Sequence, residues 1–216
     1  MKKTTLIYLG ILVFASFGFQ HSLPAQTVKD IFNSETPVMY LGIDFTKSKL
    51  IDDANTNAND LRDRHYTGIN ELVLGEPKKY DIKGAIHKSS FDHDLGSVNK
   101  RNEKANAEEI HSTNSGDFHR LKEEDIKAMV SGFDFGDKKG LGLLFIMEAM
   151  SKSDKAVAVW VTYVDMANKK VLLTDRVEGK LSMGFGVRNY YATGVKNVID
   201  NIEKKKYKEW QAKYGS

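Results

Sequence analysis

The stretch that decides the fold is "LGLLFIMEAMSKSDKAVAVWVTYVDMANKKVLLTDRVEGK", residues 141–180. It holds three apolar runs separated by the short polar turns "SKSD" and "DMANKK". Connections this short make consecutive strands pair with each other in antiparallel fashion. In the second turn, Asn168 tolerates the positive φ angle that a tight turn needs. The stretch therefore predicts a meander of three antiparallel strands.

A long helix is predicted to follow the meander, because apolar residues recur there at helical spacing. They are Tyr191, Val195, Val198, Ile199 and Ile202. Upstream, residues 36–51 alternate between apolar and polar and predict a strand with one buried face, formed by Met39, Leu41, Ile43 and Phe45. Residues 61–74 and 121–133 predict helices, and "YDIKGAI" (80–86) predicts a short second strand.

This order of elements favours the α+β class. The expected sheet has about five strands in a mixed or mostly antiparallel arrangement, with helices packed on it as an α/β sandwich. The chain has 216 residues, of which 41% are hydrophobic and 28% charged, which suits one domain with a real core. We expect that domain to span residues 26–216, with a polar excursion at about residues 87–120.

The first 25 residues have the pattern of a secretory signal peptide. Lys2 and Lys3 precede the apolar run 6–19, and a polar segment follows it up to Ala25. The run is shorter than the ~20 residues that a membrane-spanning helix needs. We therefore expect cleavage after Ala25 and a periplasmic or secreted protein, with an uncleaved N-terminal anchor as the alternative.

Charge and cysteine usage exclude several classes of function. The chain has 32 basic and 29 acidic residues, and loss of Lys2 and Lys3 brings the two counts almost level. A nearly neutral protein gives no electrostatic case for binding nucleic acid or an anionic membrane. The chain has no cysteine, which excludes disulfides, thiolate metal ligands, a thiol nucleophile and the lipid-bearing cysteine of a lipoprotein anchor.

Two segments carry a resemblance to known proteins. "VMYLGIDFTKSKLI" (38–51) resembles the opening strand of the periplasmic α/β domains of curli-secretion lipoproteins and of lipoprotein activators of penicillin-binding proteins. Residues 157–202 resemble their closing hairpin and helix, with "VLLTD" (171–175) in place of a "V-L-W-S" type segment. The chain also resembles uncharacterised exported proteins of Bacteroidetes-type bacteria. The resemblance implies a non-enzymatic interaction domain of the cell envelope, and it brings no catalytic residues.

The segment "SMGFGVRNYY" (182–191) is the main candidate site. Its two glycines could let backbone N–H groups approach an anion, with an arginine nearby. The third glycine of a dinucleotide fingerprint and the lysine of a P-loop are both absent. The alternative is a strand-to-helix turn in which Asn189 caps the helix. The candidate contacts for a partner or anion are Gly184, Phe185, Gly186, Arg188, Asn189 and Tyr190, with the exposed aromatic and the arginine as the expected anchors.

Other chemistry is not predicted. His87, Asp92, His93 and Asp94 could contribute to a metal site, but their spacing is not that of a zinc motif and a solvated loop is favoured. No G-x-S-x-G nucleophile elbow occurs. Asp44, Glu148 and Asp165 lie in or at the ends of predicted strands, where acidic residues more often cap turns or pair with lysines. We expect no metal and no cofactor, and a hydrolase that uses a pair of these carboxylates for acid–base chemistry is the less favoured alternative.

The sequence thus favours an exported, non-enzymatic protein-interaction module of the bacterial cell envelope. Its contacts would lie in the loop Phe185–Arg188 and at Tyr190. The alternative is an envelope protein that binds a small ligand or a metal. The sequence identifies neither the envelope partner nor the oligomeric state.

Overall fold

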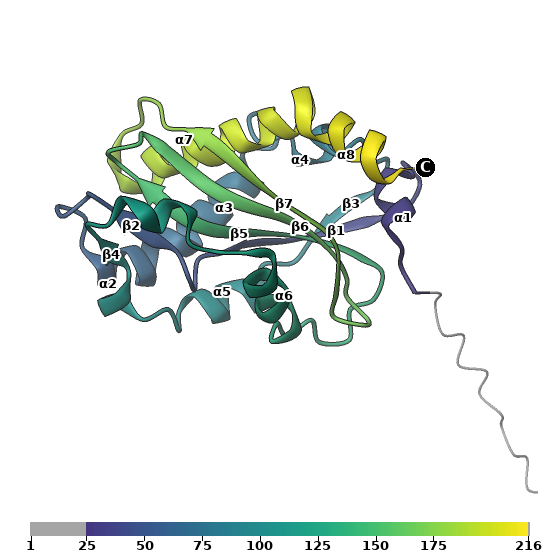
Figure 1. The fold of residues 1–216 in the computed structure, drawn as a ribbon, viewed down its shortest axis with the longest axis horizontal. Coiled ribbons are helices and arrows are strands. Elements are labelled where there is room, and N and C mark those ends of the chain that lie inside the picture. The colour runs from purple at the N-terminus through teal and green to yellow at the C-terminus, as the bar shows by residue number, and fades with distance from the viewer. Residues whose placement is uncertain (1–24, 216) are drawn as a thin grey trace, which may run out of the picture.

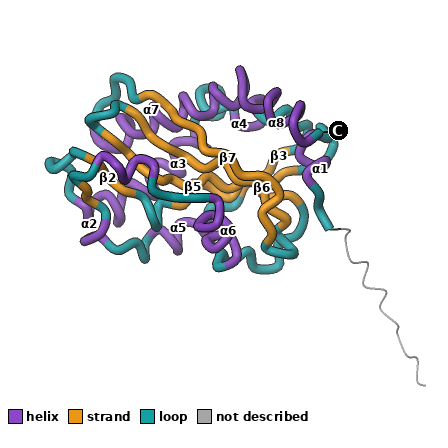
Figure 2. Tube along the Cα trace, viewed as in Figure 1, coloured by secondary structure: helices purple, strands orange, loops and turns teal. Residues whose placement is uncertain are grey.

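Strand β5 (Leu141–Ser151) is the centre of the sheet in the computed structural model, which describes residues 25–215. Except for Ala25, the predicted signal peptide lies outside the described residues. All eleven residues of β5 are buried, since β5 has neighbours on both edges and helices on both faces (Figure 1, Figure 2). The other strands are β1 (Val38–Asp44), β2 (Lys49–Ile51), β3 (Phe91–His93), β4 (His111–Ser112), β6 (Ala156–Asp165) and β7 (Lys170–Lys180).

The pairing of these strands overturns the predicted fold class. β1 and β2 lie one after the other along the same edge of β5, and both run parallel to it. β3 adds to β1 and β4 adds to β2, again in parallel. The pairs β5–β6 and β6–β7 are antiparallel. The prediction of an α+β protein with about five mostly antiparallel strands is therefore wrong: the chain forms a seven-stranded sheet of the α/β class.

Helices cover both faces of this sheet (Figure 1). The larger core lies under α3 (Tyr66–Gly75) and α7 (Gly186–Asn201). The opposite core lies under α5 (Gly96–Asn102) and α6 (Glu123–Ser131). The remaining helical segments are α1 (Val28–Phe32), α2 (Ala58–Asp60), η1 (Leu61–His65), α4 (Ile82–Ala85), η2 (Ala107–Glu109), η3 (Ser115–His119), η4 (Ile202–Lys206) and α8 (Tyr207–Tyr214).

The long connection between β1 and β5 is what allows the parallel pairing. It contains helices, and a parallel pair needs such a crossover. The segment at 87–120, expected to be a polar excursion, contributes the edge strands β3 and β4 together with α5, η2 and η3. These two strands have three and two residues, which is too short to show a periodicity of their own.

The predicted strand at residues 36–51 is interrupted. Gly42 has a φ of 92°, and the register between β1 and β5 shifts between Tyr40 and Ile43. After the shift, Ile43 faces the same core as Tyr40, so the predicted common face of Met39, Leu41, Ile43 and Phe45 is wrong. A β-bulge adds a residue to one strand and thereby changes which face the following side chains occupy.

The predicted strand "YDIKGAI" is also wrong, because Ile82–Ala85 forms the short helix α4. Asp81 caps this helix by accepting a hydrogen bond from the Gly84 backbone N–H at 2.8 Å. An aspartate in front of a short apolar run favours a helix start by satisfying a backbone donor that would otherwise be free.

The two ends of the sheet carry different features. α1 and α8 pack together at one end, where the rings of Phe32 and Tyr207 lie 5.8 Å apart edge to face. The loop between β7 and α7 lies at the opposite end, away from the C-terminus (Figure 1). That end also holds the turn between β5 and β6 and the carboxyl end of β2.

Candidate interaction site

The loop between β7 and α7, residues 181–185, has a fixed base and an exposed tip. The Leu181 N–H donates to the Lys155 carbonyl at 2.7 Å, which ties the loop to the β5–β6 turn. The Ser182 N–H donates to the Thr193 hydroxyl at 2.9 Å, which ties it to α7. Beyond these anchors, Met183 is 94% exposed and Phe185 is 92% exposed. The loop therefore presents two large apolar side chains to solvent from a fixed base.

Gly184 in the loop and Gly186 at the start of α7 are each required by the backbone geometry. Gly186 has a φ of 76°, a left-handed conformation that L side chains rarely adopt. A Cβ at Gly184 would lie 2.8 Å from the Tyr190 backbone nitrogen, closer than such contacts allow. Both glycines thus let the chain turn tightly into α7, and the spacing G-x-G is explained without a bound phosphate.

The first turn of α7 differs from the predicted one. The helix begins at Gly186, and Phe185, not Asn189, occupies the N-cap position, where its side chain makes no capping hydrogen bond. The Asn189 side chain instead donates from Nδ2 to the Phe185 carbonyl at 3.0 Å. Asn189 therefore holds the exposed Phe185 in place from inside the helix.

Arg188 and Tyr190 make contacts outside the tip. The Arg188 side chain passes over α3, where a Cβ added to Gly68 would lie 3.0 Å from its Cδ. Its Nε donates to Asn189 Oδ1 at 3.2 Å. Tyr190 is half-buried and packs edge to face on Tyr191, with 5.1 Å between the ring centroids. Of the two predicted anchors, Phe185 is presented at the tip and Arg188 lies on its flank.

A hollow of about 370 Å³ lies beside the loop. Gly184, Gly186 and Tyr190 contribute to its lining, as do Asp53 and Lys152. Asp53 lies just beyond the end of β2, and Lys152 directly follows β5. The two groups therefore lie at the carboxyl ends of two parallel strands. That end of a parallel sheet is where α/β proteins commonly place binding sites.

Asp53 is the electrostatic centre of this hollow. It is 6% exposed and accepts hydrogen bonds from the Tyr191 hydroxyl at 2.7 Å, the Thr56 hydroxyl at 2.9 Å and the Lys152 ammonium at 3.2 Å. Burial acts to raise the pKa of Asp53, but these three donors outweigh it and hold that pKa below its usual range. Burial, and then the neighbouring Asp53, raises the pKa of Tyr191. Sequence reasoning missed Asp53 and Lys152, whose only signal is their position just after apolar runs.

The residues considered for a metal site are engaged elsewhere. The imidazole of His87 packs on the Tyr207 ring at 4.4 Å. Asp92 accepts from the His93 N–H at 2.7 Å, and Asp94 forms an ion pair with Lys138 at 2.7 Å. In residues 25–215, no three His, Cys, Asp or Glu side chains are grouped so that they could hold a metal ion.

The three strand carboxylates have structural partners. Asp44 pairs with Arg101 Nε at 2.7 Å. Asp165 accepts the backbone N–H groups of Ala167 and Asn168 at 3.0 and 3.2 Å, and so caps the β6–β7 turn. Glu148 is fully buried and pairs with Arg176 at 2.6 Å. Each carboxylate therefore binds partners in a different part of the fold.

Comparison with known proteins does not assign the chain to a family. No protein-family model matches the chain, and no curated protein matches it. Among solved structures, the lipoprotein GNA1162 from Neisseria meningitidis is similar at 13% sequence identity and a TM-score of 0.30, over 79% of this chain and 98% of that one. Within the described part of the chain, no helix has the length and hydrophobicity that crossing a membrane requires.

Proposed function

We propose that this chain is an exported, non-enzymatic protein-interaction module of the bacterial cell envelope, periplasmic or secreted, and that the loop at residues 181–185 contacts its partner. The observation that carries the proposal is the exposure of Met183 and Phe185 on a loop whose base is held by hydrogen bonds. Large apolar side chains grouped on a surface mark interaction sites more often than isolated ones do.

The energetics of such a contact fit a protein partner. Burying one Phe or Met side chain contributes about 1.5–3 kcal/mol. Because Leu181 and Ser182 are already fixed by backbone hydrogen bonds, ordering of the loop costs little of that gain on binding. The hollow next to the tip offers a place for a side chain of the partner, with Tyr190 and Asp53 at its walls.

Site-specific photo-crosslinking in the native host tests the proposal. A photoreactive phenylalanine at position 185 should crosslink to one protein, whereas the same residue at position 214 should not. Tyr214 is the matched control, since it is an exposed aromatic near the C-terminus, at the other end of the sheet.

The double variant Met183→Ser/Phe185→Ser should lose capture of that protein with an unchanged thermal midpoint of unfolding, while Tyr214→Ser should keep the capture. Absence of any crosslink from position 185, or equal capture by the double variant and the unmodified chain, would show that the loop is not an interaction site.

A further inference from the structure

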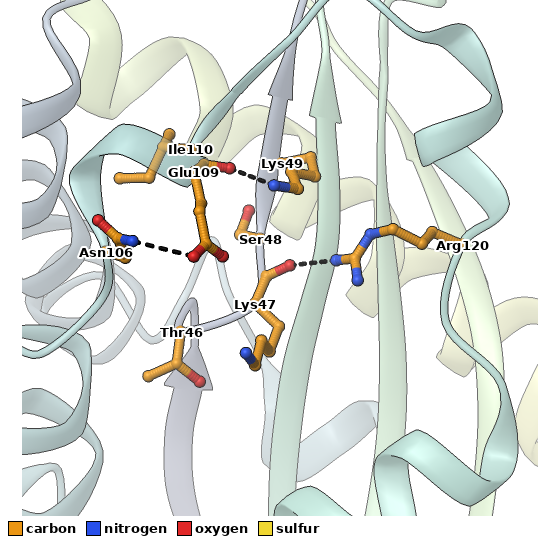
Figure 3. A pocket seen from close by; sticks show the side chains of 8 residues that line it. All are labelled: Thr46, Lys47, Ser48, Lys49, Asn106, Glu109, Ile110 and Arg120. Atoms are coloured by element: carbon orange, nitrogen blue, oxygen red, sulfur yellow. Dashed lines mark hydrogen bonds between the residues drawn. The ribbon is translucent and has the colours of Figure 1, made fainter.

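A small cavity lies beside the turn that joins β1 to β2, far along the chain from the loop at residues 181–185. Its volume is about 70 Å³. The turn residues Thr46–Lys49 form one wall, Asn106 and Glu109 form another, and Arg120 reaches in from the opposite side (Figure 3). A polar space of this size has room for several water molecules or for one small ion with oxygen atoms.

Positive charge is in excess around this cavity. Lys47, Lys49 and Arg120 are lining residues, against the single carboxylate of Glu109. Its Oε1 accepts from Asn106 Nδ2 at 2.9 Å, and its negative charge offsets one of the three positive charges (Figure 3). The Lys49 ammonium donates to the Glu109 backbone carbonyl, which keeps its charge at the cavity wall. The remaining excess of positive charge favours an anion over a metal cation.

Two buried donors at the cavity have no hydrogen-bond partner. Ser48 is 4% exposed, and its hydroxyl is unpaired in the described structure. The Nε–H of Arg120 is also buried and unpaired, although Nη2 of the same guanidinium donates to the Lys47 carbonyl at 2.5 Å. Leaving a buried donor unpaired is costly, and the cost is larger when the donor carries charge. An acceptor bound in the cavity within reach of both groups would remove this cost.

We propose that this cavity binds a small oxyanion, a carboxylate or a phosphate group, which accepts hydrogen bonds from the Ser48 hydroxyl and the Arg120 Nε–H. Lys47, which also lines the cavity, supplies further positive charge. Such a group contacts charged donors in a partly desolvated space, where charge-assisted hydrogen bonds are strongest.

Titration of the folded protein with inorganic phosphate and, separately, with acetate tests the proposal and distinguishes the two sources. Amide chemical shifts should change in a saturable way for at least one of the two anions, centred on residues 46–49 and 120. Ser48→Ala and Lys47→Gln should each weaken that binding about tenfold, the loss expected for one hydrogen bond or contact to a charged group. Lys83→Gln, which removes an exposed lysine of α4, should leave the affinity unchanged.

Two outcomes would overturn the proposal. If neither anion gives saturable changes at ionic strengths up to ~0.15 M, the cavity holds water only. The Ser48 hydroxyl also lies near the buried hydroxyl of Tyr66. If Ser48→Ala lowers the stability of the fold but leaves anion affinity unchanged, the hydroxyl serves Tyr66 and does not contact the anion, which overturns the proposed binding mode.

Discussion

At the scale of single residues, Lys88 shows how burial sets a proton affinity. Its side chain is 5% exposed, and its ammonium donates to the carbonyls of Asp30 and Asn33, each at 2.7 Å. Burial lowers the pKa of Lys88 to about 8, and the Asp30 carboxylate opposes this only in part. The ammonium thus holds the end of α1 against the segment before β3 at the expense of its own hydration.

The lowered pKa makes a prediction about stability. Between about pH 8 and the usual lysine pKa of about 10.4, the unfolded chain binds a proton at Lys88 that the folded chain has lost. The free energy of unfolding from this residue therefore rises with pH in that window. Urea unfolding at about pH 7.5 and about pH 9.5 should show a smaller rise for Lys88→Met than for the unmodified protein. Equal rises in both proteins would contradict the lowered pKa, and the exposed Lys83→Met serves as the control.

At the scale of elements, Glu148 joins the sheet to the segment before α6. Its carboxylate accepts from the Leu121 N–H at 2.5 Å, Trp160 Nε1 at 3.2 Å and Arg176 Nε at 2.6 Å. Arg176 also donates to the Phe118 carbonyl at 2.5 Å, so one ion pair links β5, β7 and η3. Because all these groups are buried or partly buried, removing either partner of the ion pair leaves a buried charge without compensation and destabilises the fold.

Arg176→Met should lower the free energy of unfolding by about 3–5 kcal/mol, since it leaves the Glu148 charge buried without a cation. Adding Glu148→Gln to that variant should restore part of the loss, because the buried charge is then gone. Glu178→Gln removes the exposed partner of the same arginine and should cost at most about 1 kcal/mol. Urea unfolding of the four proteins measures these effects, and a cost for Arg176→Met no larger than for Glu178→Gln would exclude the proposed link.

Elements that are determined by residues close together in the sequence could be predicted from it. Elements that depend on contacts between segments far apart in the sequence could not. The short connection 152–155 makes β6 pair with β5, and the apolar stripe of α7 lies on the sheet. The bulge at Gly42 depends instead on packing with α3 and α5, where the buried amides of Asn70 and Asn102 hydrogen-bond the backbone of Ile43 and Phe45 at 2.7–3.1 Å. No local sequence pattern indicates that the side chains of these two asparagines bond backbone groups that a neighbouring strand would otherwise bond.

At the scale of the whole molecule, the parallel half of the sheet was the part that sequence reasoning missed. β1 and β5 are separated by almost a hundred residues, and the pairing depends on where the helices between them pack. The candidate site divides in the same way. The tip at Phe185 could be predicted from a local motif, whereas Asp53 and Lys152 reach the hollow only because β2 and β5 end side by side.

The position of that site depends on a close contact between α7 and the sheet. A Cβ added to Gly179 of β7 would lie 2.0 Å from the Gly194 carbonyl oxygen of α7, so the helix can approach only a glycine there. Gly179→Ala should therefore displace α7 and lower the free energy of unfolding by about 1–3 kcal/mol. Gly75→Ala is the matched control, because nothing lies within 4 Å of the added Cβ and its effect should be neutral or slightly stabilising.

Because Thr193 of α7 holds the loop through the Ser182 N–H, displacing the helix also moves the tip that carries Phe185. Gly179→Ala should thus reduce both the stability and the crosslinking from position 185, whereas Phe185→Ser should reduce partner capture alone. Thermal unfolding and crosslinking on the same set of variants separate the two effects. If Gly179→Ala is as stable as the unmodified protein and crosslinks equally well, the contact between β7 and α7 does not position the loop, and the rigidity on which the proposed interaction relies must come from the β5–β6 turn.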